Sequence, residues 1–194
     1  MSLDPNIKAV CFDAFGTLVE IKDKRRSHAK LIRLIDPPAR NQLRHAIMRE
    51  KLSLKDCINQ YAPNLAQDAI QSLKDDLAAE LASIELRPRI ETLWENLRAG
   101  GYKLAVCSNL ALSYGLPLIN ALPGKADALI MSYDTGYIKP EPQIYQRVCD
   151  ALSLPADAIL FTGDTKSADV DGPINFGMAA DLIEPFTNLS LIHI

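Results

Sequence analysis

Five short apolar runs constrain the fold of this chain more than any other feature. Each is six residues long and rich in valine, isoleucine, leucine or alanine: "IKAVCF" from Ile7, "KLAVCS" from Lys103, "DALIMS" from Asp127, "AILFTG" from Ala158 and "MAADLI" from Met178. Runs of this length and composition are typical of strands buried on both faces of a sheet. Helical patterns separate the last four runs, and strand alternating with helix predicts a parallel sheet with right-handed crossovers.

Two helices of this predicted core are marked by their hydrophobic spacing. "IETLWENLRA" (90–99) places four large apolar residues on one face and stops at Gly100-Gly101, a typical helix end. "EPQIYQRVCDAL" (141–152) repeats the pattern between the third and fourth apolar runs. Both patterns predict helices that pack one face against the sheet.

The segment between the first two apolar runs has a different character. Residues 21–87 show no strand pattern and are interpreted as about four helices. One begins after Asp36 with two prolines, which suit a first helical turn, and Ser53 precedes Asp56 by three residues, as in a capping box. We therefore expect an α/β fold with two parts. The core, 1–20 and 88–194, is a Rossmann-like parallel sheet with flanking helices, and 21–87 is a small α-helical cap domain.

Composition is that of an ordinary globular protein with a sizeable core. The chain has 194 residues, of which 48% are hydrophobic and 23% charged. No apolar run approaches the roughly 20 residues needed to cross a membrane, and the N-terminal "MSLDPN" does not resemble a secretory signal. The four cysteines form no C-x-x-C pair, which favours buried reduced thiols. We expect a cytoplasmic protein without a membrane partner.

Charge is unevenly distributed along the predicted cap. Residues 22–55 contain eleven lysines and arginines against three acids, whereas residues 56–86 contain six acids against one lysine. This pattern fits two solvated helix faces, and it also fits a basic surface that faces an anionic substrate. Nucleic acid is not an expected partner, because the whole chain carries a net charge of −3 and has no nucleic-acid motif. Nothing in the sequence indicates the oligomeric state.

Polar residues follow four of the apolar runs. They are Asp13 after the first, Ser108 and Asn109 at the end of the second, Lys139 after the third, and Asp164 and Asp169 after the fourth. In an open parallel sheet, ligands bind outside the carboxyl ends of the strands, so these side chains are expected to converge. Carboxylates gathered beside one lysine repel each other unless a cation joins them, and Mg²⁺ prefers such oxygen ligands.

Four stretches of the chain resemble, in order and spacing, the motifs of the haloacid dehalogenase-like hydrolase superfamily. They are "FDAFGTL", "CSN", "KPEPQIY" and "GDTKSADVDGPINFGM". The resemblance covers essentially the whole chain, including the helical insert after the first motif. It implies that Asp13 is a nucleophile that forms a covalent aspartyl intermediate, which water then hydrolyses.

The resemblance also implies roles for the other motif residues. Ser108 would hydrogen-bond the transferring group, and Lys139 would neutralise Asp13 and the charge of the transition state. Thr17, Asn109 and Lys166 are the candidate substrate-binding residues, although Lys166 could instead point to solvent. The implied Mg²⁺ site comprises the Asp13 carboxylate, the Phe15 backbone carbonyl, Asp164, and Asp169, which would bind through water or orient Lys139.

Structural interpretations of the same residues stay open. Asp13 could form a turn, Ser108 and Asn109 could begin one, and Lys139 could lie on the surface before its proline. Asp164 could cap a helix, and Asp169 could be a solvated helix residue. The insert's two histidines, His28 and His45, have the pattern of ordinary helix surface. Gly16 is expected to supply a backbone conformation that other residues resist.

The first and fourth motifs resemble different members of the superfamily. Phosphatases of the superfamily usually carry an acid two residues after the nucleophile, where Phe15 stands here, whereas 2-haloacid dehalogenases carry an aromatic residue. The fourth motif is of the metal-binding, phosphatase-like form, because dehalogenases have serine and asparagine at the positions of Asp164 and Lys166. Dehalogenases also use a cap arginine, for which Arg40 or Arg44 are candidates.

The sequence therefore supports three functional hypotheses. We favour Mg²⁺-dependent phosphate hydrolysis of a small anionic substrate whose leaving group is already acidic, such as an acyl phosphate or a phosphoanhydride. A 2-haloacid dehalogenase is the alternative. A weakly active relative that binds a phosphorylated ligand without turnover is the third.

Overall fold

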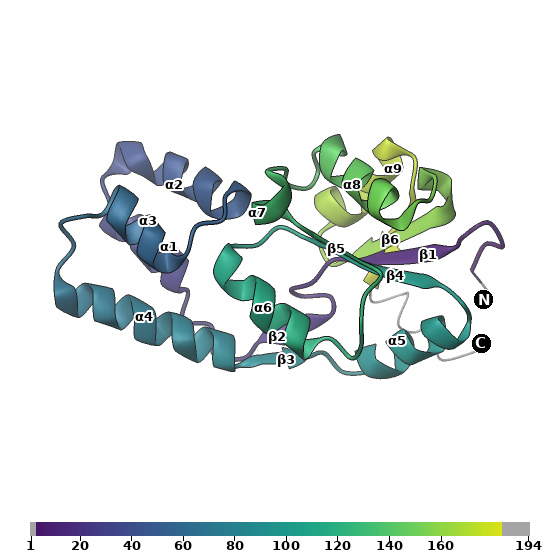
Figure 1. Ribbon diagram of the computed structural model, residues 1–194, viewed down its shortest axis with the longest axis horizontal. Helices are drawn as coiled ribbons and strands as arrows, with labels where there is room; N and C mark the ends of the chain where they lie inside the picture. The colour runs from purple at the N-terminus through teal and green to yellow at the C-terminus, as the bar shows by residue number, and fades with distance from the viewer. Residues whose placement is uncertain (1–2, 184–194) are drawn as a thin grey trace.

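The computed structural model, which describes residues 3–183, contains the predicted parallel sheet (Figure 1). Its five strands lie in the order β5-β4-β1-β6-β7, and every neighbouring pair is parallel. The strands are β1 Ala9–Phe12, β4 Lys103–Ser108, β5 Ala128–Met131, β6 Ile159–Gly163 and β7 Ala179–Leu182. Each of the five apolar runs forms one strand, so the predicted fold class is confirmed.

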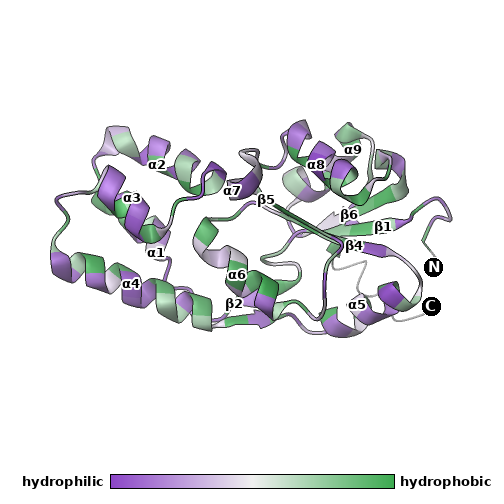
Figure 2. Ribbon diagram, viewed as in Figure 1, coloured by the Kyte–Doolittle hydropathy of each residue, from purple (hydrophilic) through white to green (hydrophobic). Residues whose placement is uncertain are grey.

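Helices cover both faces of this sheet because the strand side chains alternate between two apolar layers. On β1, Val10 and Phe12 pack on one side with the helices α5 and α6, whereas Ala9 and Cys11 pack on the other with α8 and α9. These helices are α5 Ile90–Ala99, α6 Leu112–Ala121, α8 Pro142–Leu152 and α9 Gly172–Phe176. Figure 2 shows the resulting hydrophobic strands and striped helices. All four cysteines are buried and unpaired, as predicted.

Short elements complete the connections on the sheet. They are α7 Ser132–Thr135, a single 3₁₀ turn Ala156–Ala158 and a π-helical turn Lys166–Asp171. Two residues separate the end of β6 from the π-helical turn, which contains Asp169. Among residues 3–183, no helix combines the length and apolar character needed to cross a membrane.

A separate helical lobe stands beside the sheet (Figure 1). It consists of α1 Ser27–Leu34, α2 Pro37–Arg49, α3 Leu54–Tyr61 and α4 Gln67–Ala82, which share an apolar core of their own. The predicted helix starts are confirmed: α2 begins with Pro37 after Asp36, and Ser53 and Asp56 form a complete capping box at α3. The interpretation of this lobe as a cap stays a prediction.

A two-stranded antiparallel ribbon joins the lobe to the sheet. It pairs β2 Val19–Ile21 with β3 Ile84–Leu86. The prediction that residues 21–87 contain no strand is therefore wrong at β3. The strand is only three residues long and none of its side chains is fully buried, so it lacks the apolar run that marked the other strands.

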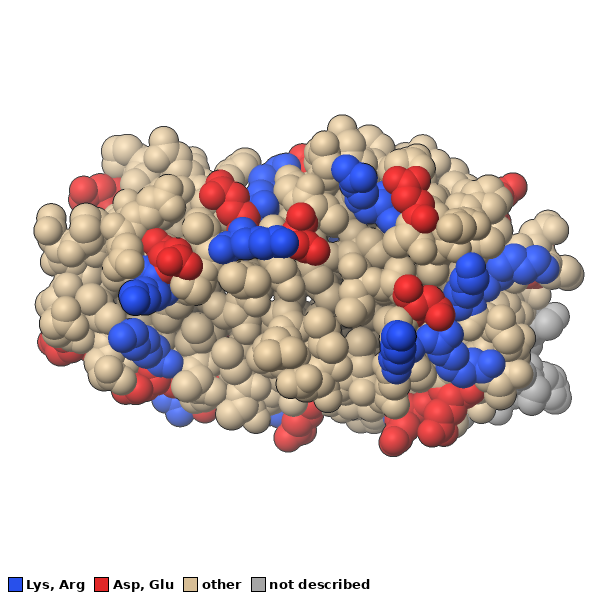
Figure 3. All heavy atoms as spheres, viewed as in Figure 1, with Lys and Arg blue, Asp and Glu red and all other residues tan. Residues whose placement is uncertain are grey.

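Charges that are segregated in the sequence are paired in space. Lys30 of α1 lies 2.5 Å from Asp76 of α4, with Arg25 also close to that carboxylate. The end of α2 reaches the sheet half of the molecule, where Arg49 pairs with Glu141 at 2.6 Å and Lys51 pairs with Asp134. Figure 3 shows basic side chains beside acidic ones on one face. Much of the positive excess of residues 22–55 is thus matched within the fold.

Candidate active site

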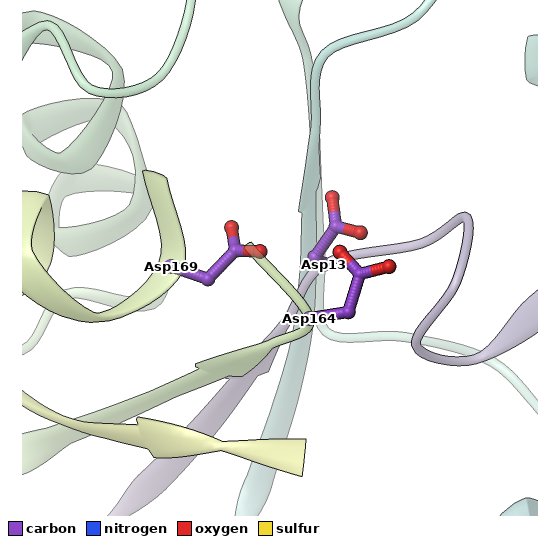
Figure 4. Close-up of side chains that lie close together, drawn as sticks. All are labelled: Asp13, Asp164 and Asp169. Carbon is purple, nitrogen blue, oxygen red and sulfur yellow. The ribbon is translucent and has the colours of Figure 1, made fainter. Parts of the chain in front are cut away.

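The carboxyl ends of three adjacent strands bring the predicted acids together. Asp13 follows the central strand β1, Ser108 ends β4, and Asp164 follows β6. Figure 4 shows the carboxylates of Asp13, Asp164 and Asp169 gathered at this edge. Each of the three offers an oxygen, and these oxygens lie within 4.8 Å of one another. We call this the catalytic edge, after the role that the family resemblance implies for Asp13.

Lys139 is the buried cation of the catalytic edge. Its Nζ donates to Asp13 Oδ1 and to Asp169 Oδ1, both at 2.7 Å, and only 5% of the residue is exposed. Ser108 Oγ donates to the same Asp13 oxygen at 3.2 Å. Burial alone would lower the pKa of Lys139, but the attraction of Asp13 and other anionic neighbours outweighs it and raises the pKa. Lys139 is therefore held as a charged donor directed at Asp13, and the surface interpretation of this lysine is wrong.

Asp169 is 1% exposed and has both carboxylate oxygens occupied. One accepts from Lys139, and the other accepts the backbone N–H of Thr165 at 2.9 Å. Burial raises the pKa of Asp169, and the positive charge of Lys139 opposes that rise. Its interpretation as a solvated helix residue is wrong, since the π-helical turn directs the side chain inward. Of its two predicted roles, this geometry favours orientation of Lys139.

Asp164 lies over the turn that carries the first motif. Gly16 has a φ of +90°, and a Cβ at this position would collide with the Asp164 carboxylate. The conformation predicted for Gly16 is thus present, and the missing side chain lets the exposed Asp164 approach. A carboxylate held here beside Asp13 fits a hard divalent cation, because all the available donors are oxygens.

The turn from residue 14 to 19 is fixed by its own backbone and by Arg87. The Ala14 carbonyl accepts the N–H groups of Leu18 at 2.8 Å and Val19 at 3.0 Å, and the Arg87 guanidinium donates to the Gly16 carbonyl. The candidate substrate residue Thr17 is wholly buried, and its hydroxyl has no partner among the described residues. This geometry orients the backbone of the turn and leaves Thr17 beneath it.

The two remaining candidate substrate residues are in different surroundings. Asn109 holds the lysine loop, because its side-chain amide donates to the Lys139 carbonyl at 3.0 Å and accepts the Lys139 N–H at 2.8 Å. Lys166 is exposed and pairs with Asp171 at 2.8 Å. Asn109 thus joins the second motif to the third, and Lys166 lies in a surface ion pair.

Comparison with known proteins agrees with this arrangement of motifs. Residues 7–177 match the model of the haloacid dehalogenase-like hydrolase family. The chain belongs to this family of hydrolases.

Three proteins to which the chain is similar illustrate the range of activities in the family. An (S)-2-haloacid dehalogenase 4A of Burkholderia cepacia is 24% identical over 89% of this chain and 80% of its own length. An N-acylneuraminate-9-phosphatase of Rattus norvegicus is 24% identical over 90% and 81%. A HAD phosphatase of Thermococcus onnurineus, known from its crystal structure, superposes with a TM-score of 0.62 at 25% identity, covering 90% of this chain and 85% of its own.

A second feature of this hydrolase lies beside the catalytic edge. A cavity of about 540 Å³, here called the lobe cavity, lies between the helical lobe and the sheet half. Phe15 and Asn109 form part of its wall, so it adjoins the residues next to Asp13 and Ser108. Of the two candidate arginines, Arg44 lines the cavity, whereas Arg40 donates to the carbonyls of Ile35 and Arg33.

His28 is the residue of the lobe cavity that sequence reasoning misjudged. The prediction of a surface histidine is wrong for His28, which is 9% exposed, and right for His45, which is exposed. His28 packs on Tyr114 with ring centroids 5.6 Å apart, and Tyr114 in turn contacts Phe15 edge-on at 5.8 Å. Tyr114 comes from α6, on the sheet side, and no local sequence pattern places it opposite the lobe.

Glu80 ties the two walls of this cavity together. Its carboxylate accepts the backbone N–H groups of Arg26 at 2.6 Å and Ser27 at 3.0 Å, where α1 begins, and the Tyr114 hydroxyl at 3.0 Å. Only 3% of Glu80 is exposed. Three donors satisfy this buried carboxylate, and through them it joins the lobe to the sheet half.

Proposed function

We propose that this protein is a Mg²⁺-dependent phosphatase that hydrolyses a small anionic substrate through a covalent intermediate at Asp13. The observation that carries this proposal is the position of Asp164, which lies over Gly16 and within 4.8 Å of the Asp13 and Asp169 oxygens. Asp13, the Phe15 carbonyl and Asp164 would hold the ion, with Asp169 behind them. Mg²⁺ bound there neutralises phosphoryl oxygens and lowers the repulsion between an anionic nucleophile and its target.

The proposed reaction has two steps, and Asp13 supplies the nucleophile for the first. Its carboxylate attacks phosphorus, the bond from phosphorus to the leaving oxygen breaks, and that oxygen departs with the electron pair. Water then attacks phosphorus in the aspartyl phosphate, which releases inorganic phosphate and restores the carboxylate. Lys139 donates to Asp13 Oδ1 throughout, and Ser108 is placed to hydrogen-bond the transferring group.

Phe15 restricts the substrates that this site can turn over. Its ring cannot protonate the leaving oxygen or activate water, and general acid–base help is worth roughly 10²–10⁴-fold. The loss matters least for a leaving group that is stable as an anion. Acyl phosphates, phosphoanhydrides and aryl phosphates therefore suit this site better than alkyl phosphates.

Haloacid dehalogenation is the second candidate function. Phe15 favours it, since a halide departs without a proton, and so does Arg44, which lines the lobe cavity. Against it stands Asp164, which adds a negative charge close to Asp13 where a metal-free reaction has no use for one.

The experiment that separates these functions compares acetyl phosphate, p-nitrophenyl phosphate and 2-chloropropionate, each with Mg²⁺ and with EDTA. Metal-dependent phosphate release that disappears in Asp13→Asn supports the proposal. Chloride release in EDTA would overturn it in favour of dehalogenation. No turnover of any compound, together with a higher melting temperature in the presence of phosphate and Mg²⁺, would indicate a binding protein.

A further inference from the structure

The lobe cavity is apolar over most of its wall. Its charged residues include Arg26 and Arg44, which are exposed, and Glu80, whose carboxylate is already bonded to both walls. The apolar wall comes from the lobe, the β-ribbon and the sheet half: Phe15, Ile21, Ile32, Ile47, Met48 and Leu110. A polyhydroxylated group in this space would lose its water contacts and find few partners in return.

The lobe cavity adjoins the catalytic edge through Phe15. This residue stands two positions after Asp13, so its backbone belongs to the catalytic turn while its ring forms cavity wall. Asn109, one residue after Ser108, also lines the cavity and holds Lys139. A substrate whose phosphoryl group meets Asp13 therefore has the lobe cavity as the adjoining space for the group bonded to it.

His28 is the buried polar group of this cavity that lacks a hydrogen bond. It is 9% exposed, and neither ring nitrogen has a partner within the described residues. An unpaired buried polar group raises the free energy of the folded protein. The position of His28 on the cavity wall therefore suggests that a ligand bonds it. Burial lowers the pKa of His28, although the Glu80 charge opposes this, and a neutral imidazole offers one donor and one acceptor.

We propose that the lobe cavity selects an aryl or acyl phosphate with an apolar body, and that His28 hydrogen-bonds one polar atom on that body. The inference rests on the proposed phosphatase function and narrows its substrate class. It also agrees with Phe15, because aryl and acyl leaving groups need little proton donation.

Binding of phosphonates tests this selectivity without chemistry, since a carbon–phosphorus bond of this kind is not hydrolysed at such a site. The protein with Mg²⁺ would be titrated calorimetrically with benzylphosphonate and with dihydroxypropylphosphonate. Burial of the aromatic ring should make benzylphosphonate bind about tenfold to 100-fold more tightly. Equal affinity, or a preference for the dihydroxylated compound, would overturn the inference.

Two variants on the same helix test whether the cavity wall causes the preference for benzylphosphonate. Ile32→Asn places an amide in the cavity wall and should remove most of the preference for benzylphosphonate. Leu34→Asn is the matched control, because Leu34 is 54% exposed and does not line the cavity. Both variants should unfold cooperatively near the wild-type temperature. An equal loss in both variants, or no loss in Ile32→Asn, would contradict the assignment of the cavity.

His28→Phe tests the hydrogen bond while keeping an aromatic ring against Tyr114. It should weaken para-hydroxybenzylphosphonate by about threefold to tenfold and leave benzylphosphonate unchanged or slightly tighter. An equal change for both probes would overturn the role of His28. Turnover of acetyl phosphate and of p-nitrophenyl phosphate is measured separately. If neither is hydrolysed but the cavity is selective, the phosphatase function alone is refuted. Turnover without selectivity would refute the cavity inference alone.

Discussion

The catalytic edge and the lobe cavity meet at Phe15 but differ in how their polar groups are satisfied. At the edge, Lys139 bonds two carboxylates and Asp169 has a partner for each oxygen. In the cavity, His28 has no hydrogen-bond partner among the described residues and faces mostly apolar walls. The edge is held in place by its own hydrogen bonds, as electrostatic stabilisation in the proposed reaction requires. The cavity leaves His28 available to bond the proposed ligand.

The largest expected effect comes from breaking the edge at Lys139. Lys139→Met leaves Asp13 and Asp169 as buried carboxylates without their cation, which should lower the free energy of unfolding by about 3–5 kcal/mol. Turnover should fall by about 10²–10³-fold. Urea unfolding in EDTA and initial rates with Mg²⁺ measure the two effects.

Lys166→Met is the matched control for that variant. Lys166 also pairs with an aspartate, but its side chain is 74% exposed, and such surface pairs contribute at most about 1 kcal/mol. If both variants kept wild-type stability, the edge would not be the preorganised network described above.

Phe15 belongs to both regions, so substitutions at this position test the two together. Phe15→Asp places an acid where the ring stood, and it should raise turnover of alkyl phosphates, whose leaving groups need a proton, by up to about 10²-fold. Aryl phosphates should gain much less and should lose affinity, because part of the apolar wall is gone. Values of kcat and KM for phenyl phosphate and ethyl phosphate separate these effects.

Phe15→Asn has nearly the same size as Phe15→Asp but cannot donate a carboxylic proton. It should therefore lose aryl affinity without any gain on alkyl phosphates. If Phe15→Asn gained as much alkyl phosphate turnover as Phe15→Asp, the gain would come from added space or polarity. That result would refute the account of the missing acid.

A smaller effect is expected where Gly16 lets Asp164 approach Asp13. Gly16→Ala adds a Cβ that collides with the Asp164 carboxylate, so the Mg²⁺ concentration giving half-maximal rate should rise by about tenfold or more. Gly101→Ala serves as the control, since Gly101 has a similar φ of +82° with nothing within 4 Å of an added Cβ. Its cost should be confined to stability, at about 1 kcal/mol. An unchanged Mg²⁺ requirement in Gly16→Ala would remove Asp164 from the metal site.

The sequence predicted the catalytic edge better than the lobe cavity for a physical reason. The edge is built from residues at the ends of buried strands, and a parallel sheet aligns those ends whatever the connections do. Finding the apolar runs was therefore enough to predict that Asp13, Ser108 and Asp164 would converge. The tight approach of Asp164 to Gly16 was not predicted, because it depends on the path of two loops.

The lobe cavity depends on how the helical lobe and the sheet half face each other, which no local sequence pattern records. The spacing of α1 did not show that His28 faces Tyr114 of α6, because that contact crosses from the lobe to the sheet half. The strand β3 was missed for a related reason, since its three residues gain their structure from pairing with β2. Hydrophobic periodicity reports burial within one element and says little about which partner covers it.

The smallest expected effect is a pH dependence of stability that originates in the cavity. Burial lowers the pKa of His28 in the folded protein, so the unfolded chain takes up a proton at a higher pH than the folded protein does. The stability associated with neutral His28 is therefore complete above about pH 6.5 and is lost as the pH falls through the folded-state pKa.

His28→Phe removes this titration. In urea unfolding, the variant should lose less stability than the wild type between about pH 7 and about pH 5. His45→Phe, at an exposed site, is the matched control for replacing a histidine with phenylalanine. If His28→Phe retained the wild-type slope, His28 would not be held neutral by the cavity, and its selection of a single polar atom would lose its electrostatic basis.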